Sequence, residues 1–312
     1  MKRKNAALEP GAILIFAAGC LWGSIGLFIR LMSDAGAGAA VISFLRMVFA
    51  FVILLVVTVI RSGISSFRVS GRVLFFSAML GLVCHGVYNV FYSWAVVRVG
   101  VTVSAVLLNV APVFTATLSA IFFRERITGR KGAALLINVF GCVLAATGGQ
   151  FSAGSLSLLG ILFGAAAGLC YALTAIFGKL AGEGSDPFVI STYSYFFAAL
   201  FLAVFMRPWD TPVTVTPTIV RLRFLYALIP TAIGYLLYYQ GVQRIQESSK
   251  VPVIASMETV TAAILGVLAL GEKLTVIHYL GIVVVMGSIV MMQHKQERSR
   301  CGEGGEPAKS MQ

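Results

Sequence analysis

Long apolar runs alternate with short polar connections along the chain, from residue 12 to residue 292. Each run has about 17–24 residues, the length that an α-helix needs to cross a hydrocarbon core of about 30 Å. The strands of a membrane β-barrel would instead alternate apolar and polar residues over segments of about ten. We therefore expect an all-α integral membrane protein with ten transmembrane helices, over residues 12–32, 39–60, 73–96, 102–123, 132–148, 157–180, 188–206, 224–243, 252–270 and 276–292.

The composition agrees with this interpretation. Hydrophobic residues make up 58% of the 312 residues, charged residues make up 12%, and the mean hydropathy is +0.91. Soluble chains have about 45–50% apolar and about 25% charged residues, so a soluble enzyme is excluded. The five cysteines form no CxxC pair and the three histidines are far apart in the sequence, so we expect no metal site and no cofactor.

Positive charge is distributed unevenly among the predicted connections. The connections on the side of the N-terminus hold 17 lysines and arginines, and those on the opposite side hold 6. Positively charged loops stay in the cytoplasm, so we expect both termini to be cytoplasmic and the protein to lie in the inner or plasma membrane. This bias explains the net charge of +12 without a nucleic-acid partner.

The two halves of the chain match each other helix by helix. At an offset of 149 residues Trp22 corresponds to Tyr171, and at an offset of 146 residues Tyr92 corresponds to Tyr238. The offset drifts by a few residues, as loop insertions would cause, but the order of the matching helices is kept. We infer two copies of one five-helix unit.

A five-helix unit begins and ends on opposite sides of the membrane, so the second copy must be inverted relative to the first. Inverted repeats recur in secondary transporters, whose substrate sites lie near the midplane between the repeats. The expected organisation is a cytoplasmic N-terminal segment, two five-helix repeats and a disordered cytoplasmic tail, over residues 1–11, 12–149, 157–292 and 293–312.

Several short motifs carry a resemblance to a known family. They are Leu21-Trp22-Gly23-Ser24, Phe44-Leu45-Arg46, Ala111-Pro112-Val113-Phe114, Arg124-Glu125-Arg126-Ile127-Thr128, Met257-Glu258-Thr259-Val260 and Gly271-Glu272-Lys273-Leu274-Thr275. With these motifs the chain resembles the EamA-type transporters of the drug/metabolite transporter superfamily, over residues 12 to 292. The resemblance implies export of amino acids or similar small metabolites through a central cavity lined by helices 1, 3, 4, 6, 8 and 9. Because this chain has Thr259 where the family often has proline, a bend in the ninth helix is an open question.

Three ionisable residues lie well inside the predicted spans, where a charge costs about 2.5–3.5 kcal/mol. Glu258 can bind a substrate ammonium group or carry a coupling proton, or it can be a structural, hydrogen-bonded carboxyl. Arg46 can bind a carboxylate in a bidentate fork, but such an arginine more often ties helices together. His85 has no carboxylate or cysteine at metal-ligand spacing, which favours a hydrogen-bonded core histidine over a proton relay.

Polar and aromatic residues form two further groups of candidates. His85, Asn89 and Tyr92 share one face of helix 3, with Tyr88 beside them, and Tyr235 and Tyr238 occupy the equivalent face of helix 8. Two such faces should meet each other or a wet cavity rather than lipid, although interhelical hydrogen bonding alone would also explain them.

The middle of helix 4 and the centres of helices 1 and 6 supply the remaining candidates. Pro112 leaves a carbonyl near residue 108 without its helical partner, beside Asn109, where a substrate ammonium group can bind. Trp22 and Tyr171 lie in the middle of their spans, where they can stack on a substrate.

Helices 5 and 10 carry little polar character apart from Asn138 and Ser288, so we expect them to buttress the bundle or to form a homodimer. Glu125 and Glu272 lie at helix ends beside basic residues, which indicates a structural role.

The pattern favours a secondary transporter of small metabolites that works by alternating access. It contains no GxxxxGK[ST] sequence for ATP and no HExxH motif for a metalloprotease, so we do not expect an enzyme. Proton antiport and downhill facilitated export both remain open. A lipid flippase of the same superfamily is the nearest alternative, followed by a membrane-embedded enzyme or a sensor. The expected partners are the lipid bilayer and a small-molecule substrate.

Overall fold

The computed structural model describes residues 9–150, 157–182, 185–210, 216–271 and 273–293, and this part of the chain is built from helices and their connections. The predicted N-terminal segment before residue 9 and the predicted tail beyond residue 293 lie outside the described residues. The α-helices are α1 (Pro10–Trp22), α2 (Ile25–Asp34), α3 (Ala39–Ser62), α4 (Gly71–Met79), α5 (Tyr88–Leu108), α6 (Ala111–Phe123), α7 (Gly129–Thr147), α8 (Leu158–Gly182), α9 (Pro187–Met206), α10 (Pro217–Tyr226), α11 (Gly234–Arg244), α12 (Val251–Ala255), α13 (Met257–Leu270) and α14 (Val276–Gln293).

These elements combine into ten helical segments that are long and apolar enough to cross a membrane, which confirms the predicted fold class. They run over Pro10–Asp34, Val41–Ser62, Gly71–Gly100, Val103–Phe123, Gly129–Thr147, Leu158–Gly182, Pro187–Met206, Pro217–Arg244, Ser248–Leu270 and Val276–Gln293. The turn between the third and fourth spans is at Gly100, inside α5, where φ is +81° and the helical geometry breaks.

The eighth span begins at Pro217, seven residues before the predicted position 224. Its first turns carry Arg221 and Arg223, which lower the local hydropathy and hide the helix start. The helix begins there because Thr216 accepts a hydrogen bond from the backbone N–H of Ile219 at 3.3 Å, and proline fits the first turn.

Two pairs of irregular segments recur at equivalent places in the two halves. A π-helical segment occupies Leu80–Val87 in the third span, and another occupies Ala227–Ile233 in the eighth. The helix is also interrupted between α5 and α6 in the fourth span, and between α12 and α13 in the ninth. The structure therefore repeats the helices and these two irregularities, as expected for duplicated five-helix units, whereas the break between α1 and α2 has no counterpart in α8.

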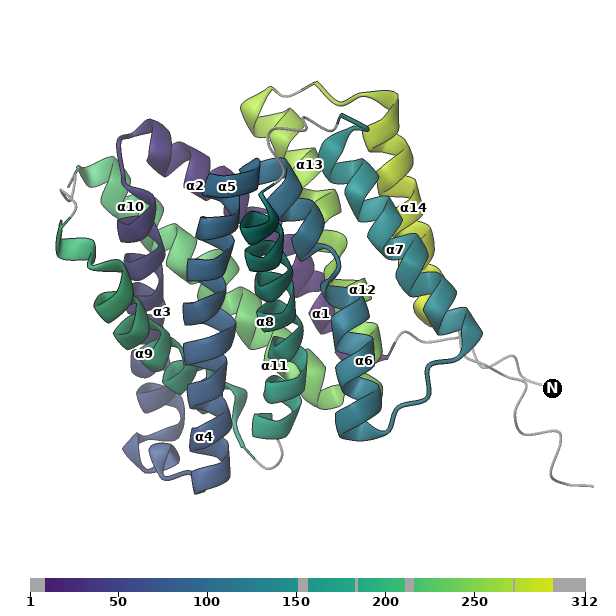
Figure 1. Ribbon diagram of the computed structural model, residues 1–312. Helices are drawn as coiled ribbons and strands as arrows, with labels where there is room; N and C mark the ends of the chain where they lie inside the picture. The colour runs from purple at the N-terminus through teal and green to yellow at the C-terminus, as the bar shows by residue number, and fades with distance from the viewer. Residues whose placement is uncertain (1–8, 151–156, 183–184, 211–215, 272, 294–312) are drawn as a thin grey trace, which may run out of the picture.

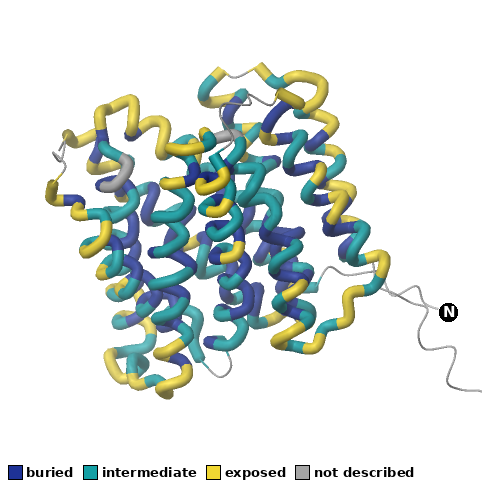
Figure 2. The backbone as a smooth tube through the Cα atoms, in the orientation of Figure 1, coloured by how far each residue is buried: buried dark blue, intermediate teal, exposed yellow. Residues whose placement is uncertain are grey.

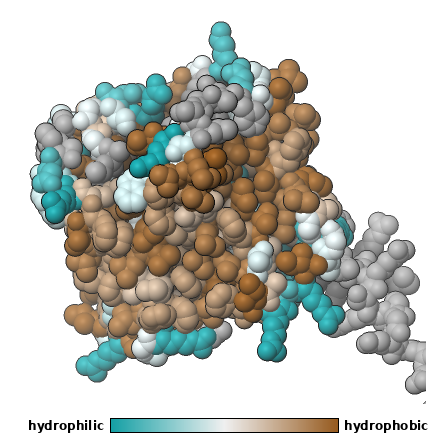
Figure 3. Space-filling view, in the orientation of Figure 1, coloured by the Kyte–Doolittle hydropathy of each residue, from teal (hydrophilic) through white to brown (hydrophobic). Residues whose placement is uncertain are grey.

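The ten spans form one bundle, and its outer surface is apolar, as contact with lipid requires. In Figure 1, α7 and α14 lie side by side at one edge of the bundle, α3, α9 and α10 lie at the opposite edge, and α8 lies between them. Buried residues concentrate on the inner sides of the helices (Figure 2). The visible face carries a broad hydrophobic belt with hydrophilic residues at both ends (Figure 3), as a bilayer requires.

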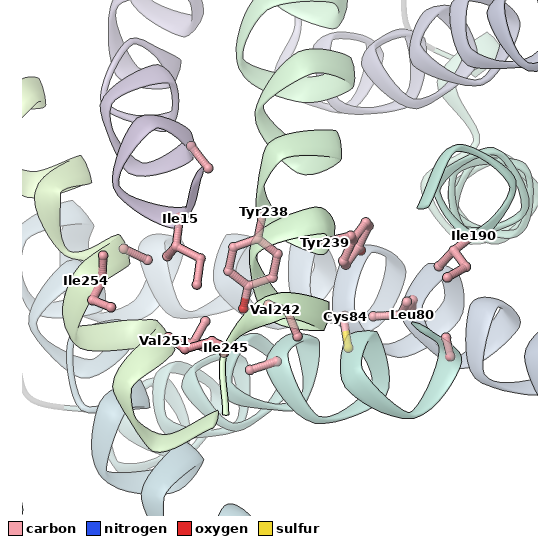
Figure 4. Packing of buried hydrophobic residues seen from close by; sticks show 14 of the residues in the cluster. Ile15, Leu80, Cys84, Ile190, Tyr238, Tyr239, Val242, Ile245, Val251 and Ile254 are labelled. Carbon is pink, nitrogen blue, oxygen red and sulfur yellow. The ribbon is translucent and has the colours of Figure 1, made fainter. Parts of the chain in front are cut away.

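The largest buried cluster connects the two halves through α11. Figure 4 shows Tyr238 and Tyr239 next to each other on this helix, with Ile15 and Ile254 on one side and Cys84 on the other. Tyr239 is fully buried and Tyr238 is 5% exposed. Residues from the first span, the third span and the ninth span thus share one core.

Close packing joins α7 to α14. A Cβ atom added at Gly281 of α14 would lie 2.3 Å from the backbone nitrogen of Ala145. A Cβ atom added at Gly287, on the same helix, would meet nothing within 4 Å. Small residues at such contacts let membrane helices approach closely, and here the approach is backbone to backbone.

We expect Gly281→Ala to destabilise the protein, because the added methyl group must push α14 away from the α7 backbone. Overpacking of this kind costs about 1–3 kcal/mol. The measurement is thermal unfolding of the purified protein in detergent, with Gly287→Ala as the matched control. A melting temperature of Gly281→Ala equal to that of Gly287→Ala would contradict the packing described for this helix pair.

Candidate functional site

A cavity of about 350 Å³ lies between the two repeats. Its wall is formed by α5 and α6 of the first half, by α8, α12 and α13 of the second half, and by the peripheral pair α7 and α14. The lining runs from Glu258 and Asn138 to Leu274 and His278, which lie where α7 ends and α14 begins. Asn138 has nine residues of α7 on each side, so the deep part of the cavity is near the membrane midplane.

Both interrupted helices contribute their interruptions to the cavity wall. In the fourth span the lining includes Asn109 and Pro112, and proline cannot donate the usual backbone hydrogen bond to the carbonyl four residues earlier. In the ninth span it includes Ser256, whose Oγ donates to the Val253 carbonyl at 2.6 Å. The ninth span is thus interrupted without a proline at Thr259, which answers the question that the sequence left open.

Glu258 lies in the first turn of α13 and lines the cavity. The Tyr171 hydroxyl donates to its Oε2 at 3.5 Å. The N-terminal end of a helix carries a partial positive charge, which stabilises a carboxylate at this position. Among the described residues no lysine, arginine or histidine lies within 4.0 Å of this carboxylate, so it has acceptor capacity for a ligand.

Half of the predicted binding residues line this cavity and half lie outside its wall. Tyr92, Asn109, Pro112, Tyr171 and Glu258 belong to the wall. The other five, which lie among the neighbouring aromatic residues or on their helices, are Trp22, Tyr88, Asn89, Tyr235 and Tyr238.

Trp22 connects the cavity wall to a cluster of aromatic rings. Its ring centroid is 4.6 Å from that of Tyr235, 4.9 Å from that of Tyr238 and 6.3 Å from that of Tyr171. The ring centroid of Tyr88 lies 6.2 Å from that of Tyr171. These ring contacts help to fix the position of Tyr171, and therefore of the hydroxyl group that donates to Glu258.

His85 and Asn89 make their contacts away from the cavity. The His85 Nε2 lies 3.3 Å from the Tyr239 hydroxyl, and the imidazole ring stacks on Tyr195 at 5.2 Å. The Asn89 side-chain amide donates to the His85 carbonyl in its own helix. The structure therefore gives both residues protein partners.

Arg46 is also held by neighbouring side chains outside the cavity wall. One guanidinium N–H donates to the Tyr226 hydroxyl at 3.2 Å, and the guanidinium carbon lies 5.3 Å from the centroid of the same ring. This contact joins α3 to α10, as expected for an arginine that ties helices together.

Sequence reasoning missed the contribution of the fifth and tenth spans to the cavity. We expected these helices to act only as buttresses or as a dimer contact, but α7 supplies Asn138 and Cys142 to the wall and α14 supplies His278. The sequence signal was the isolated Asn138 in an apolar helix, since a polar side chain within the membrane needs a partner or a function.

The end of the bundle opposite Leu274 and His278 is held together by a carboxylate. Glu125, in the connection between α6 and α7, accepts hydrogen bonds from the backbone N–H groups of Ser248 at 2.7 Å and Ser249 at 3.2 Å, and from the Ser249 hydroxyl at 2.8 Å. Its side chain is 9% exposed, and the Lys179 Nζ lies 3.8 Å away. The first half thus caps the start of the ninth span of the second half.

Ion pairs surround this contact. Glu247 lies 2.7 Å from the Lys131 Nζ and 2.9 Å from the Lys250 Nζ, and Lys250 lies 3.7 Å from Glu9. Partial burial raises the pKa of Glu247, but the hydrogen bonds from Lys131 and Lys250 outweigh this effect and bring the pKa below its usual value. Glu247 is therefore ionised at neutral pH and supports the contact.

Ten spans in two matching halves thus enclose a cavity lined by polar and apolar side chains, and the hydrogen bonds of Glu125 hold one end of the bundle together. The family model of the EamA-like transporter family matches residues 9–147 and 158–293, and each segment contains five of the ten spans. The chain belongs to this family, which confirms the resemblance carried by its motifs.

Relatives of known name agree with this assignment. The chain is 22% identical to the "uncharacterized inner membrane transporter YicL" of Salmonella typhimurium, over 93% of this chain and 97% of the relative. It is 26% identical to a protein of Streptantibioticus cattleyicolor named "probable terminal-alkyne amino-acid exporter", over 73% of this chain and 75% of the relative. A solved protein structure superposes with a TM-score of 0.79 at 16% identity, covering 92% of this chain and 98% of that one, which shows a shared fold.

We expect Glu125→Gln to loosen the end of the bundle that Glu125 holds together. One carboxylate oxygen becomes an NH2 group, which cannot accept the hydrogen bonds that Ser248 and Ser249 donate. The readout is the rate at which a hydrophilic thiol reagent modifies a cysteine at position 251, where Val251 is fully buried, in a chain whose native cysteines are replaced. Loss of a charge-assisted cap predicts a rate about ten- to hundredfold higher.

The matched control for this prediction is Glu9→Gln, which removes only the 3.7 Å contact to Lys250. It should change the modification rate by less than about twofold, because Lys250 keeps its 2.9 Å contact with Glu247 and a long ion pair near the surface contributes little. Equal rates in Glu125→Gln and in the parent chain would show that Glu125 does not hold this end closed.

Proposed function

We propose that this protein is a secondary transporter that exports amino acids or related small metabolites across the inner or plasma membrane by alternating access. The observation that carries the proposal is the cavity at the interface of the repeats, with the carboxylate of Glu258 exposed to it and free of any ion pair among the described residues. The amino-acid exporter named among the relatives supports the substrate class.

In this proposal Glu258 binds the ammonium group of the substrate. A cation at this position gains a charge-assisted hydrogen bond from a carboxylate that has only the 3.5 Å bond from Tyr171. The ring faces of Tyr92 and Tyr171 supply apolar surface in the same wall, and the amide of Asn109 supplies a further polar contact. Trp22, Tyr88, Tyr235 and Tyr238 support this wall from the neighbouring aromatic cluster, whereas Asn89 bonds within its own helix.

The transport cycle that we propose moves the repeats 12–149 and 157–292 against each other. The cavity lining reaches the end of the bundle at Leu274 and His278, while Glu125 holds the other end together. By the positive-charge bias the end held by Glu125 faces the cytoplasm, with both termini. Substrate release and uptake on opposite sides then require the contact of Glu125 with Ser248 and Ser249 to break and re-form.

The test is counterflow in liposomes that contain the purified protein. The vesicles are loaded with a pool of amino acids and related metabolites, and mass spectrometry measures which solutes exchange, with and without an imposed pH gradient. Selective exchange of a few amine-bearing solutes is the expected result, and the response to the gradient separates proton antiport from facilitated export. If no solute exchanges while the protein is folded, the proposal fails and lipid translocation becomes the function to test.

We expect Glu258→Gln to raise the half-saturation concentration for amine-bearing substrates about tenfold or more, because the variant keeps the shape of the side chain but loses its charge. The measurement is the concentration dependence of counterflow, and Glu9→Gln, which removes only the 3.7 Å contact to Lys250, is the control carboxylate outside the cavity. If exchange is unchanged and only the response to a pH gradient is lost, Glu258 carries a proton and does not bind the substrate.

A further inference from the structure

Asn138 is a fully buried polar side chain in the middle of α7, and its amide orientation is determined by its neighbours. The Nδ2 group donates to the Ser256 Oγ at 2.8 Å and to the Ser288 Oγ at 2.9 Å. Each serine hydroxyl uses its own hydrogen on a backbone carbonyl, at Val253 and Val285 respectively. A flipped amide would require both hydroxyls to turn away from these carbonyls.

The carbonyl oxygen of this amide is left without a hydrogen-bond partner. Both N–H groups of Asn138 are used, and the Oδ1 is a buried acceptor that no described group donates to. An unpaired buried polar atom is costly, and native proteins rarely keep one without a function or a bound molecule. Asn138 belongs to the cavity wall together with Glu258, so this unpaired acceptor lies in the proposed binding site.

We propose that the Asn138 Oδ1 and the Glu258 carboxylate form a two-acceptor subsite that selects a primary ammonium group. A primary ammonium ion has three N–H donors in different directions, so it can satisfy both acceptors at once. A quaternary ammonium ion has the same charge but no N–H, and it would leave the Asn138 acceptor unpaired and buried. This assignment rests on the proposed transport function and adds the group that the substrate must carry.

The subsite also explains why Asn138 is held by two serines from different spans. Ser256 belongs to the interruption two residues before Glu258, and Ser288 belongs to α14. The amide is therefore bonded directly to the residue that precedes α13. A preorganised acceptor of this kind loses little conformational freedom when it binds its ligand.

The experiment measures binding rather than transport, so that its outcome is independent of the counterflow test. The probes are n-butylammonium and its N,N,N-trimethyl analogue, and the readout is the concentration dependence of the thermal stabilisation of the full-length protein. Asn138→Leu replaces the amide with an apolar group of similar size. The Ser256 and Ser288 hydroxyls keep their bonds to backbone carbonyls in this variant, so it leaves no buried donor unpaired.

The expected result is that the parent protein prefers n-butylammonium, and that Asn138→Leu lowers its affinity about ten- to hundredfold and removes the preference. Asn138→Ala should give the same loss of preference, and it covers the case in which leucine does not fit. Gly287→Ala is the matched control, because it changes α14 at the position next to Ser288 but its added methyl group meets nothing within 4 Å, and it should retain the preference.

Three outcomes would overturn the proposal. If the parent protein binds the two probes equally, the Oδ1 does not select N–H donors. If Asn138→Leu binds both probes as the parent does, the Oδ1 contacts only water. If both probes lose affinity by the same factor, Asn138 has a purely structural role. If counterflow occurs but the protein does not prefer the primary ammonium probe, the proposed function stands and the subsite is wrong. If the protein prefers the primary ammonium probe but no counterflow occurs, only the subsite is supported.

Discussion

Inside a hydrocarbon layer every backbone N–H and C=O group needs a partner within the protein, and this requirement decides where the helices of this transporter are interrupted. The interruptions between α5 and α6 and between α12 and α13 occur where both helices line the cavity, away from lipid. At the second one the Ser256 hydroxyl satisfies the Val253 carbonyl. A break in the helix and a polar cavity therefore occur together, and the break brings Glu258 to a helix N-terminus in the middle of the membrane.

The two repeats share their architecture but differ in chemistry at the cavity. At an offset of 147 residues Asn109 corresponds to Ser256, whereas Glu258 corresponds to Ala111 and Asn138 corresponds to Val285. The scaffold is thus close to symmetric while the deep acceptors are not. Each acceptor is present once, so a substrate with one ammonium group has one orientation in which its charge is satisfied. A symmetric cavity would instead have placed two carboxylates close together, at a high electrostatic cost.

The sequence predicted the spans, their order and the repeat, because long apolar runs and a colinear set of matches depend on local composition. It misplaced the start of the eighth span because Arg221 and Arg223 make a helical segment look like a loop. It singled out Glu258, Tyr171 and Asn109, which line the cavity, because charged or polar residues in a membrane span stand out. It could not separate these from Trp22 or Tyr235, since helical periodicity shows which residues share a face and does not show which neighbouring helix covers that face.

The contribution of α7 could not be predicted for a related reason. Asn138 stands out as a polar residue, but its two partners lie 118 and 150 residues away in the sequence. No pattern within one helix indicates that Ser256 and Ser288 meet at the same amide. The outcome depends on the close backbone contact of α7 with α14, which brings the fifth and tenth spans to the cavity wall.

The short helix α12 connects the two parts of the molecule on which the transport cycle depends. At its first end Ser248 and Ser249 are capped by Glu125, and at its other end Ser256 is bonded to Asn138, beside Glu258. The eight residue steps from Ser248 to Ser256 span about 12 Å at 1.5 Å per residue. All five residues of α12 are buried, so packing as well as the chain links its two ends. A ligand that draws Glu258 and Ser256 toward Asn138 therefore acts directly on the contact that Glu125 makes at the closed end.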